Sequence, residues 1–485
     1  MTALFSRFAA SLLSCVSITF FIASSRANPA PSVCLRDLAP QIEAIVNRPN
    51  FVRSRFGVFI QTLGTRQTLY SRDAEQFFIP ASNVKILTTA AALRGLSPTY
   101  RIRTSVYGTE TPDGWRVRLV GRGDPSFSDR QLKDLVQQLK QRGIQRISEL
   151  IVEDSYFGRD AVNSGWAVGD IQATYAVPVS SLILNENGLG LKVLPQALGQ
   201  PLKVEWDDPT EANRWKIDNR SRTVDAKAEE FIEVGRDLSQ PILKVTGQLH
   251  VGSEPSMNGV AIPNPGEYFL RKFVRSLNDA GMTIARSSVS DRAIQSNGIE
   301  VAKIDSPPLS ELVKEANQNS NNLYAEVLLR TLGVQNPNAA GRTVLEHGLT
   351  SVTSKLNQFG INKTEIELTD GSGLARQNWS TPAAFVKVLQ AMSQELEGKY
   401  FRESLPIAGV SGTLQNRFQN SPAKGITRAK TGTLTGVTAL SGYIEPPNYP
   451  SIAFSIMINQ SPDFAPVQRN AIDEIVGLLA RLRSC

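Results

Sequence analysis

The chain has 485 residues, of which 41% are hydrophobic and 20% charged, and a formal net charge of +7. These values indicate a globular protein large enough for two or three domains. The positive charges are interleaved with acidic residues, which argues against a nucleic-acid-binding protein, and the mildly basic balance suits an anionic wall or membrane surface.

The first 27 residues have the features of a secretory signal peptide. They contain no acidic residue. They do contain an apolar stretch from Phe8 to Ala23 and a small-x-small cleavage site at Ser25-Arg26-Ala27. Repeated serines argue against a membrane anchor, and too little apolar sequence precedes Cys15 for a lipoprotein site. No other segment is long enough to span a bilayer. The sequence therefore predicts an exported protein of the periplasm or cell envelope, with at most peripheral membrane association.

Two cysteines would remain after cleavage, Cys34 and Cys485, near the two ends of the chain. In an oxidising compartment such a pair predicts one disulfide, which requires both ends to lie in the same domain. The alternative is two free thiols on frayed tails.

A Ser-x-x-Lys pattern opens a predicted helix near the N-terminus. The stretch from Ser82 to Leu93 is apolar and alanine-rich, Pro80 lies just upstream, and Ser or Asn is available as a helix cap. Residues i and i+3 share a helix face, so Ser82 and Lys85 would lie side by side. If burial or nearby cations lower its pKa, the lysine can remove the serine proton. The plain alternative is a helix cap followed by a solvated lysine.

The middle of the chain, from about Thr99 to Ile304, is predicted to be an insertion. Two stretches share the order helix, glycine, strand, with helices at 129–143 and 267–281 and strands at 147–152 and 282–287. Short strand-like segments between proline and glycine turns lie between them. We expect an inserted α/β domain of residues 99–186 and 253–304, which carries a nested β-rich domain of residues 187–252.

A second motif, Ser320-Asn321-Asn322, lies in a polar turn between two predicted helices, 310–316 and 323–332. In such a turn a hydroxyl and an amide can both point into a cleft, although solvated Asn/Ser turns are common.

The third motif, Lys430-Thr431-Gly432, precedes two strand-like runs, 438–444 and 452–458, with a turn at Pro446-Pro447-Asn448. A strand glycine lets a ligand backbone approach, and a lysine offers a cation to a carboxylate. A plain edge strand is the alternative.

Each motif alone is weak, because the chain contains other matches. Ser421-Pro422-Ala423-Lys424 also fits Ser-x-x-Lys, but its proline places it in a loop. Ser276-Leu277-Asn278 falls inside an amphipathic helix, and Ser256-Met257-Asn258 falls in a predicted loop. The three selected motifs together are the components of a serine acyl-transfer site that uses lysine as its base.

With these motifs the chain resembles the low-molecular-mass penicillin-binding proteins, in the D-alanyl-D-alanine carboxypeptidase/endopeptidase family with large inserted domains. Other segments are similar to that family as well: GRGDP at 121–125, YAVP at 175–178, DGSGL at 370–374 and AGVSGTL at 408–414. The resemblance extends from about Leu35 to the C-terminus.

The resemblance implies an α/β (α+β) fold. Residues 28–98 and 305–485 would form a catalytic domain like serine β-lactamases and penicillin-binding transpeptidases, an antiparallel sheet flanked by helices. The inserted α/β and β-rich domains would interrupt it.

The resemblance also implies a serine D,D-peptidase that acts on peptidoglycan stem peptides through an acyl-enzyme, is inhibited by β-lactams and needs no metal or other cofactor. Ser82 would be the nucleophile and Lys85 its base. Ser320 would relay the proton to the leaving amine, and Asn322 would hold the amide side of the substrate.

The Lys430 strand would bind the other end of the substrate. Lys430 and Thr431 would meet the terminal carboxylate, and Gly432 would lie close to the ligand backbone. The backbone N–H groups of Ser82 and Thr433 would form the oxyanion hole.

Members of this family are expected to use an acidic residue of the inserted domain to meet the free amine of the diamino-acid side chain. Here Glu153 stands where aspartate is expected, and Glu153 or Asp154 is the predicted partner. A solvated acidic turn is the alternative. The diamino acid, and the choice between trimming terminal D-Ala and cutting cross-links, stay open.

Other classes of protein fit less well. His250 and His347 are the only histidines, and the pattern G-x-S-x-G is absent, which excludes a Ser-His-Asp hydrolase and a zinc carboxypeptidase. A β-lactamase would need rapid deacylation, for which no glutamate can be assigned. A non-catalytic peptidoglycan-binding protein is the remaining alternative, although all the key residues are intact.

Overall fold

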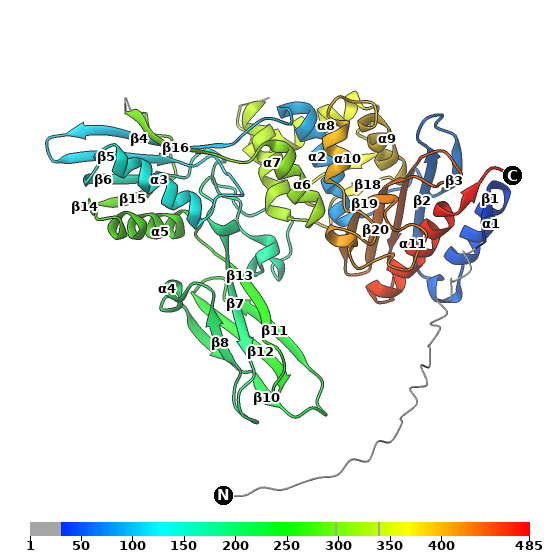
Figure 1. Ribbon diagram of the computed structural model, residues 1–485, viewed down its shortest axis with the longest axis horizontal. Helices are drawn as coiled ribbons and strands as arrows, with labels where there is room; N and C mark the ends of the chain where they lie inside the picture. The colour runs from blue at the N-terminus through cyan, green and yellow to red at the C-terminus, as the bar shows by residue number, and fades with distance from the viewer. Residues whose placement is uncertain (1–30, 296–297, 338–339) are drawn as a thin grey trace, which may run out of the picture.

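The computed structural model describes residues 31–295, 298–337 and 340–485, so the predicted signal peptide at 1–27 lies outside the described residues. Within the described ranges, no helix has both the length and the apolar character needed to cross a bilayer. Figure 1 shows three units: one that contains β2, β3 and the C-terminus, an α/β unit at the opposite end of the long axis, and a β-rich unit that projects from between them.

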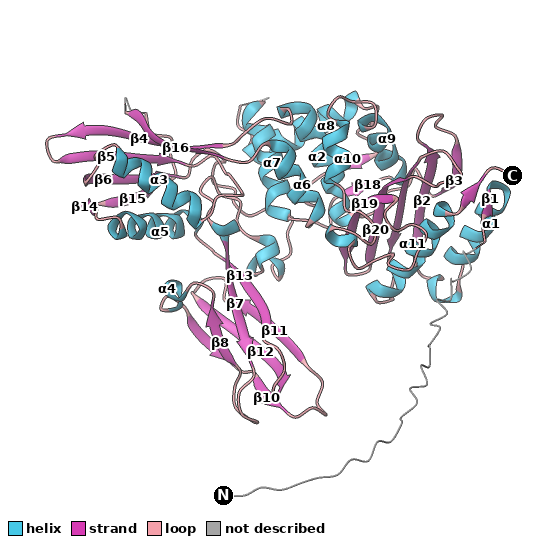
Figure 2. Cartoon of the chain, in the orientation of Figure 1, coloured by secondary structure: helices cyan, strands magenta, loops and turns pink. Residues whose placement is uncertain are grey.

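A five-stranded antiparallel sheet forms the centre of the first unit, in the order β19-β20-β21-β2-β3. Its strands come from both ends of the chain: β2 (Arg55–Thr62), β3 (Thr68–Arg72), β19 (Thr427–Leu434), β20 (Val437–Ile444) and β21 (Ile452–Asn459). Every residue of β20 and β21 is buried, because helices cover both faces of the sheet (Figure 2). The strand with the Lys430 motif, β19, lies at the edge, where a ligand backbone can approach it.

Alternate side chains of this sheet pack on opposite faces. Val58 and Ile456 pack with α1 (Leu35–Val46) and α11 (Ala465–Ala480), whereas Met457 packs on the other face. The helices on that face are α2 (Val84–Leu96), α6 (Leu309–Gln318), α7 (Asn322–Gln335), α8 (Val344–Gln358), α9 (Pro382–Met392) and α10 (Gly398–Ser404). The short strands β17 (Ile366–Glu367) and β18 (Trp379–Ser380) pair with each other. This arrangement confirms the predicted antiparallel sheet flanked by helices.

The inserted α/β unit has a six-stranded sheet in the order β14-β6-β5-β4-β16, with β15 also paired to β6. Its strands are β4 (Arg103–Thr111), β5 (Gly114–Val120), β6 (Arg146–Glu153), β14 (Thr283–Ile284), β15 (Ser287–Ser290) and β16 (Ile299–Asp305). The helices α3 (Asp129–Gln141) and α5 (Pro265–Asp279) share its apolar core. The second predicted strand, 282–287, is divided into β14 and β15, which both run parallel to β6.

The nested β-rich unit contains two small sheets. One has β7 (Gly188–Leu194), β8 (Lys203–Trp206) and β13 (Ser256–Ala261), and the other has β9 (Lys216–Asn219), β10 (Arg222–Val224), β11 (Phe231–Arg236) and β12 (Ile242–His250). A short helix, α4 (Pro209–Ala212), follows β8. Because β13 pairs with β7, the hydrogen bonding of this unit continues beyond the proposed boundary at residue 252. Ser256 opens a strand and does not lie in the loop expected there.

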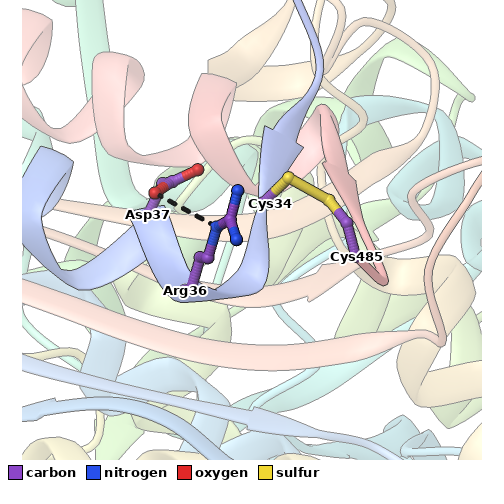
Figure 3. Close-up of a disulfide and its surroundings, with 4 residues drawn as sticks. All are labelled: Cys34, Arg36, Asp37 and Cys485. Atoms are coloured by element: carbon purple, nitrogen blue, oxygen red, sulfur yellow. Dashed lines mark ion pairs between the residues drawn. A yellow bond between two sulfur atoms is a disulfide. The ribbon is translucent and has the colours of Figure 1, made fainter.

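Two contacts join the ends of the described chain. The strand β1 (Val33–Cys34) pairs in parallel with β22 (Leu482–Arg483). A disulfide links Cys34 to Cys485, with Cα atoms 5.4 Å apart (Figure 3). Both ends therefore belong to the unit that contains the central sheet.

We expect Cys34→Ser to lower the free energy of unfolding of this unit by about 2–4 kcal/mol, because the bond restricts the unfolded chain. The two cysteines are 451 positions apart, so the loop that the bond closes is long. Thermal unfolding with and without a reductant measures the effect. Reductant should lower the melting temperature of the wild type and leave that of Cys34→Ser unchanged. Equal melting temperatures for the two oxidised proteins would contradict the prediction.

Candidate active site

Ser82 and Lys85 lie where a short 3₁₀ turn, η2 (Ala81–Asn83), leads into α2. The α-helix begins at Val84, two residues later than expected, and Asn83 does not cap it. Ala81 has a φ of 48°, a left-handed conformation that is unfavourable for a residue with a side chain. Such strained residues cluster at active sites and ligand-binding sites.

The side chain of Asn83 fixes this turn to the central sheet. Its amide lies 2.7 Å from Ser441 Oγ of β20. In the orientation that satisfies both ends of the amide, Nδ2 donates to the carbonyl oxygen of Lys430 at 2.8 Å and the amide oxygen faces Ser441. The Ser82 turn is thus held against the strand that carries the third motif.

Lys85 is 0% exposed, and its ammonium nitrogen reaches three groups. Nζ lies 3.0 Å from Ser82 Oγ, 2.6 Å from Asn322 Oδ1 and 2.7 Å from the carbonyl oxygen of Ser372. The first two motifs therefore meet at the lysine, although Lys85 and Asn322 are far apart in the sequence.

Burial lowers the pKa of Lys85 to about 7, although the nearby carboxylates of Asp370 and Glu326 oppose the shift. A neutral amine has two N–H groups and one lone pair. The oxygens of Asn322 and Ser372 can accept the two N–H groups, which leaves the lone pair for the hydroxyl of Ser82. This geometry allows the neutral amine of Lys85 to accept the proton of the Ser82 hydroxyl.

Ser320 connects the second motif to the third. It lies in the turn between α6 and α7 with a φ of 56°, another left-handed residue that carries a side chain. Lys430 Nζ donates to Ser320 Oγ and to the carbonyl oxygen of Thr431, both at 2.8 Å. Complete burial and the neighbouring Lys85 hold the pKa of Lys430 well below its usual value.

Strand β19 passes directly beside the Ser82 turn. A Cβ atom on Gly432 would lie 2.6 Å from the carbonyl oxygen of Pro80 and 3.2 Å from the backbone nitrogen of Ser82. Glycine permits this approach. Thr433, the next residue, is exposed, and Thr431 Oγ1 lies 2.8 Å from Thr413 Oγ1. The predicted substrate-binding residues of β19 therefore line the same site as Ser82.

The turn at 370–373, to which the sequence analysis assigned no role, supplies the Ser372 carbonyl to Lys85. The carboxylate of Glu326 accepts from the backbone N–H groups of Gly371 and Ser372, each at 2.9 Å. Glu326 is fully buried and is paired with Arg330 at 2.9 Å. The family-like sequence DGSGL was the available signal for this turn.

We expect Gly373→Ala to slow acylation of the site about 10²-fold, because small displacements of catalytic groups have large effects on rate. Gly373 has a φ of 82°, and a Cβ atom there would lie 1.9 Å from the carbonyl oxygen of Ala81, next to Ser82. Gly360→Ala is the matched control, since Gly360 has a φ of 79° and nothing within 4 Å of its Cβ position. Stopped-flow acylation by a chromogenic β-lactam provides the measurement. Equal rates for Gly373→Ala and the control would contradict the prediction.

The inserted part of the chain, between α2 and α6, also contacts the site. The carbonyl oxygen of Tyr175 accepts a hydrogen bond from Asn322 Nδ2 at 2.8 Å. The segment around Tyr175 was noted for its resemblance alone, and no pattern in the sequence indicated this contact.

Glu153 and Asp154 are occupied by contacts within the inserted unit. Glu153 is 4% exposed and accepts from Arg118 Nη1 at 2.8 Å. Asp154 accepts from Ser180 Oγ at 2.8 Å and from the backbone N–H of Ser181 at 2.7 Å. These contacts favour structural roles for both carboxylates over the predicted contact with a substrate amine.

In chemical terms, the site combines the buried lysines Lys85 and Lys430, the hydroxyl of Ser320 and the carboxamide of Asn322 around the half-buried Ser82. In the described part of the chain, no group of three or more His, Cys, Asp or Glu side chains is placed to hold a metal ion. The arrangement supports acyl transfer to Ser82 with an amine as base.

Comparisons with known proteins agree with this chemistry. Residues 38–482 match the model of the D-Ala-D-Ala carboxypeptidase 3 (S13) family. The chain is 30% identical over 470 residues to a D-alanyl-D-alanine carboxypeptidase of Actinomadura sp. (strain R39), covering 93% of this chain and 86% of the relative. It is 25% identical to the D-alanyl-D-alanine carboxypeptidase DacB of Haemophilus influenzae, covering 84% and 85%.

Solved structures show the same fold. The crystal structure of penicillin binding protein 4 (dacB) from Haemophilus influenzae superimposes with a TM-score of 0.79 at 23% identity, covering 92% of this chain and 98% of that one. A predatory peptidoglycan endopeptidase from Bdellovibrio bacteriovorus superimposes with a TM-score of 0.51 at 18% identity, covering 87% and 92%.

Proposed function

The chain belongs to the D-Ala-D-Ala carboxypeptidase 3 (S13) family and is a serine-type D,D-peptidase, and on that premise we propose that Ser82 is its nucleophile and Lys85 its general base. The observation that carries this assignment is the 3.0 Å contact between Lys85 Nζ and Ser82 Oγ, with two other oxygens placed to accept the N–H groups of the amine. The substrates are peptidoglycan stem peptides that end in D-Ala-D-Ala, or the D-Ala cross-links made from them.

In the acylation step, Ser82 Oγ attacks the carbonyl carbon of the penultimate D-Ala and its proton moves to Lys85 Nζ. A new C–O bond forms and the carbonyl oxygen becomes negatively charged. The backbone N–H groups of Ser82 and Thr433 stabilise that charge, an effect typically worth about 3–4 kcal/mol for one such donor. The close passage of Gly432 beside the Ser82 nitrogen supports this placement of the oxyanion hole.

In the second half of acylation, the C–N bond to the terminal residue breaks. Ser320 relays the proton that Lys85 took from Ser82 to the leaving amine, which restores the neutral form of Lys85. The contact of Ser320 with Lys430 at 2.8 Å keeps the Ser320 hydroxyl polarised. The terminal carboxylate binds beside Lys430 and Thr431. Its negative charge favours the protonated form of Lys430, which offsets the effect of burial.

Water then attacks the acyl carbon and gives a proton to Lys85, and Lys85 passes a proton to Ser82 Oγ as the ester C–O bond breaks, so that the carboxylic acid product leaves and both residues return to their starting forms. A β-lactam follows the same first step, but its ring-opened product stays attached to Ser82 and resists water. We therefore propose that β-lactams acylate this protein and inhibit it.

We propose that the protein acts outside the cytoplasm, at the cell envelope where peptidoglycan lies. The disulfide between Cys34 and Cys485 supports this location, because such bonds persist in oxidising compartments. The predicted signal peptide agrees with it.

The function is tested with a purified pentapeptide-containing muropeptide and with a D-Ala-cross-linked dimer. The wild type should release D-Ala from the first substrate, or monomers from the second, as followed by chromatography and mass spectrometry. The ratio of the two rates separates carboxypeptidase from endopeptidase activity. Failure of the wild type to cleave either substrate would contradict the proposal.

A further inference from the structure

We propose that the inserted segment 163–175 orients the groups that accept hydrogen bonds from Lys85, and that Trp166 is a positioning residue for Lys85. The inference rests on the proposed function of Lys85 as the base and extends it to residues outside the three motifs. In Figure 1, α6 and α7 lie on the side of the catalytic unit that faces the inserted units. The segment accepts a hydrogen bond from Asn322 and donates to the turn that carries Ser372, and the side-chain oxygen of Asn322 and the carbonyl oxygen of Ser372 accept from Lys85.

The first oxygen belongs to Asn322. A carboxamide has one accepting end and one donating end, so fixing one end orients the other. Asn322 Nδ2 donates to the carbonyl oxygen of Tyr175 at 2.8 Å, and Oδ1 then faces Lys85 Nζ at 2.6 Å. The inserted segment thereby selects the amide orientation that Lys85 requires.

The second oxygen is the carbonyl of Ser372, which belongs to the turn that begins at Asp370. Trp166 Nε1 donates to Asp370 Oδ2 at 3.0 Å, and Asn163 Nδ2 donates to the carbonyl oxygen of Thr369 at 2.8 Å. Asp370 in turn accepts from the backbone N–H of Gly373 at 2.7 Å. The segment therefore contacts the turn just before the residue whose carbonyl reaches Lys85.

The packing around these hydrogen bonds is tight. Trp166 is 6% exposed and shares an apolar cluster with Leu323 of α7 and Leu374 of the turn. A Cβ atom on Gly165 would lie 2.7 Å from Thr369 Cγ2. Because the indole is buried, water is poorly placed to replace its N–H if that donor is removed.

The charged groups around Lys85 predict how its pKa should change when the N–H of Trp166 is removed. Asp370 and Glu326 raise its pKa, Glu326 is paired with Arg330, and Lys430 lies nearby as a second lysine. The Trp166 N–H partly compensates the charge of Asp370. Without this N–H, the carboxylate of Asp370 should stabilise the protonated form of Lys85 more strongly, so the pKa of Lys85 should rise.

The experiment compares the wild type with Trp166→Phe, which removes the N–H donor and keeps an aromatic ring. The rate constant of acylation by a chromogenic β-lactam is measured from pH 5 to 9, and melting temperatures are recorded in parallel. We expect Trp166→Phe to acylate about tenfold more slowly at neutral pH, with the midpoint of the pH–rate profile moved to higher pH. Trp206→Phe is the matched control, because Trp206 lies in the nested unit against Trp215, and it should behave as the wild type.

A second variant, Asn163→Ala, removes the donor to Thr369 and should shift the profile in the same direction, so the test does not depend on the folding of one variant. An unchanged pH midpoint in a folded variant would overturn the inference, even if the melting temperature falls, because a purely structural role predicts that result. Acylation at the wild-type rate would overturn it as well. A wild type that forms no β-lactam adduct would instead contradict the proposed function itself, and the two failures are thereby distinguished.

Discussion

Ser82→Ala is expected to lower D-Ala release and β-lactam acylation by at least about 10³-fold, because the substitution removes the atom that forms the acyl bond. The surrounding geometry should survive, since the turn is held by Asn83 and by the close approach of Gly432, neither of which uses the Ser82 hydroxyl. Steady-state D-Ala release and a fluorescent penicillin label measure the two activities separately.

Ser421→Ala is the matched control, because Ser421 begins the other Ser-x-x-Lys sequence in the chain. Its hydroxyl accepts from the backbone N–H of Ala423 at 3.2 Å in a loop and has no part in the proposed mechanism. The control should keep wild-type activity. Labelling of Ser82→Ala at the wild-type rate would contradict the assignment of the nucleophile.

Lys85→Arg is expected to slow acylation by about 10²–10⁴-fold at every pH, which is the usual contribution of a general base. A guanidinium stays protonated and cannot accept the serine proton. In the wild type, burial lowers the pKa of Lys85 to about 7. The neutral amine is the active form, so acylation should rise with pH through a midpoint near 7 and level off at higher pH.

The measurement is the acylation rate constant as a function of pH, and Lys424→Arg is the control. Lys424 ends the second Ser-x-x-Lys sequence, and its Nζ donates to Gln419 Oε1 at 2.8 Å on the surface. The profile of this control should match the wild type. A wild-type midpoint near the ordinary lysine pKa, or a Lys85→Arg variant with unchanged rates, would contradict the role of Lys85.

The sequence predicted the contact between Ser82 and Lys85 because it depends on local geometry. Residues three apart stay neighbours in both a 3₁₀ turn and an α-helix, so the pair was found even though α2 begins at Val84. The left-handed φ of Ala81 could not be predicted, because alanine carries no local signal for that conformation.

The contacts that complete the site join residues far apart in the chain. Only the folded chain brings these partners together: the backbone carbonyl of Tyr175 accepts from Asn322, and the side chains of Asp370 and Thr413 make hydrogen bonds to distant residues. No spacing rule links Trp166 to Asp370. These contacts therefore became visible only in the structure, although the segments that contain Tyr175, Asp370 and Thr413 resemble the family.

Nothing in the sequence indicated that Arg118 would pair with Glu153. The resemblance to the family implied that a carboxylate of the inserted domain meets a substrate amine, whereas Glu153 is paired with Arg118 on the neighbouring strand β5. Cross-strand pairing of this kind depends on the register of β5 and β6, which the sequence pattern does not specify. The pairing of β13 with β7, beyond residue 252, is likewise a long-range contact that the sequence pattern does not specify.

The central claim, that Ser82 is the acylated nucleophile, is tested most directly by intact-protein mass after incubation with benzylpenicillin, followed by peptide mapping. We predict a lasting mass increase of one penicillin in the wild type, located on the peptide that contains Ser82 and absent from Ser82→Ala. No adduct with the drug left intact, or an adduct on another peptide such as that of Ser421, would contradict the account. Rapid destruction of penicillin without a lasting adduct would contradict slow deacylation and indicate a β-lactamase.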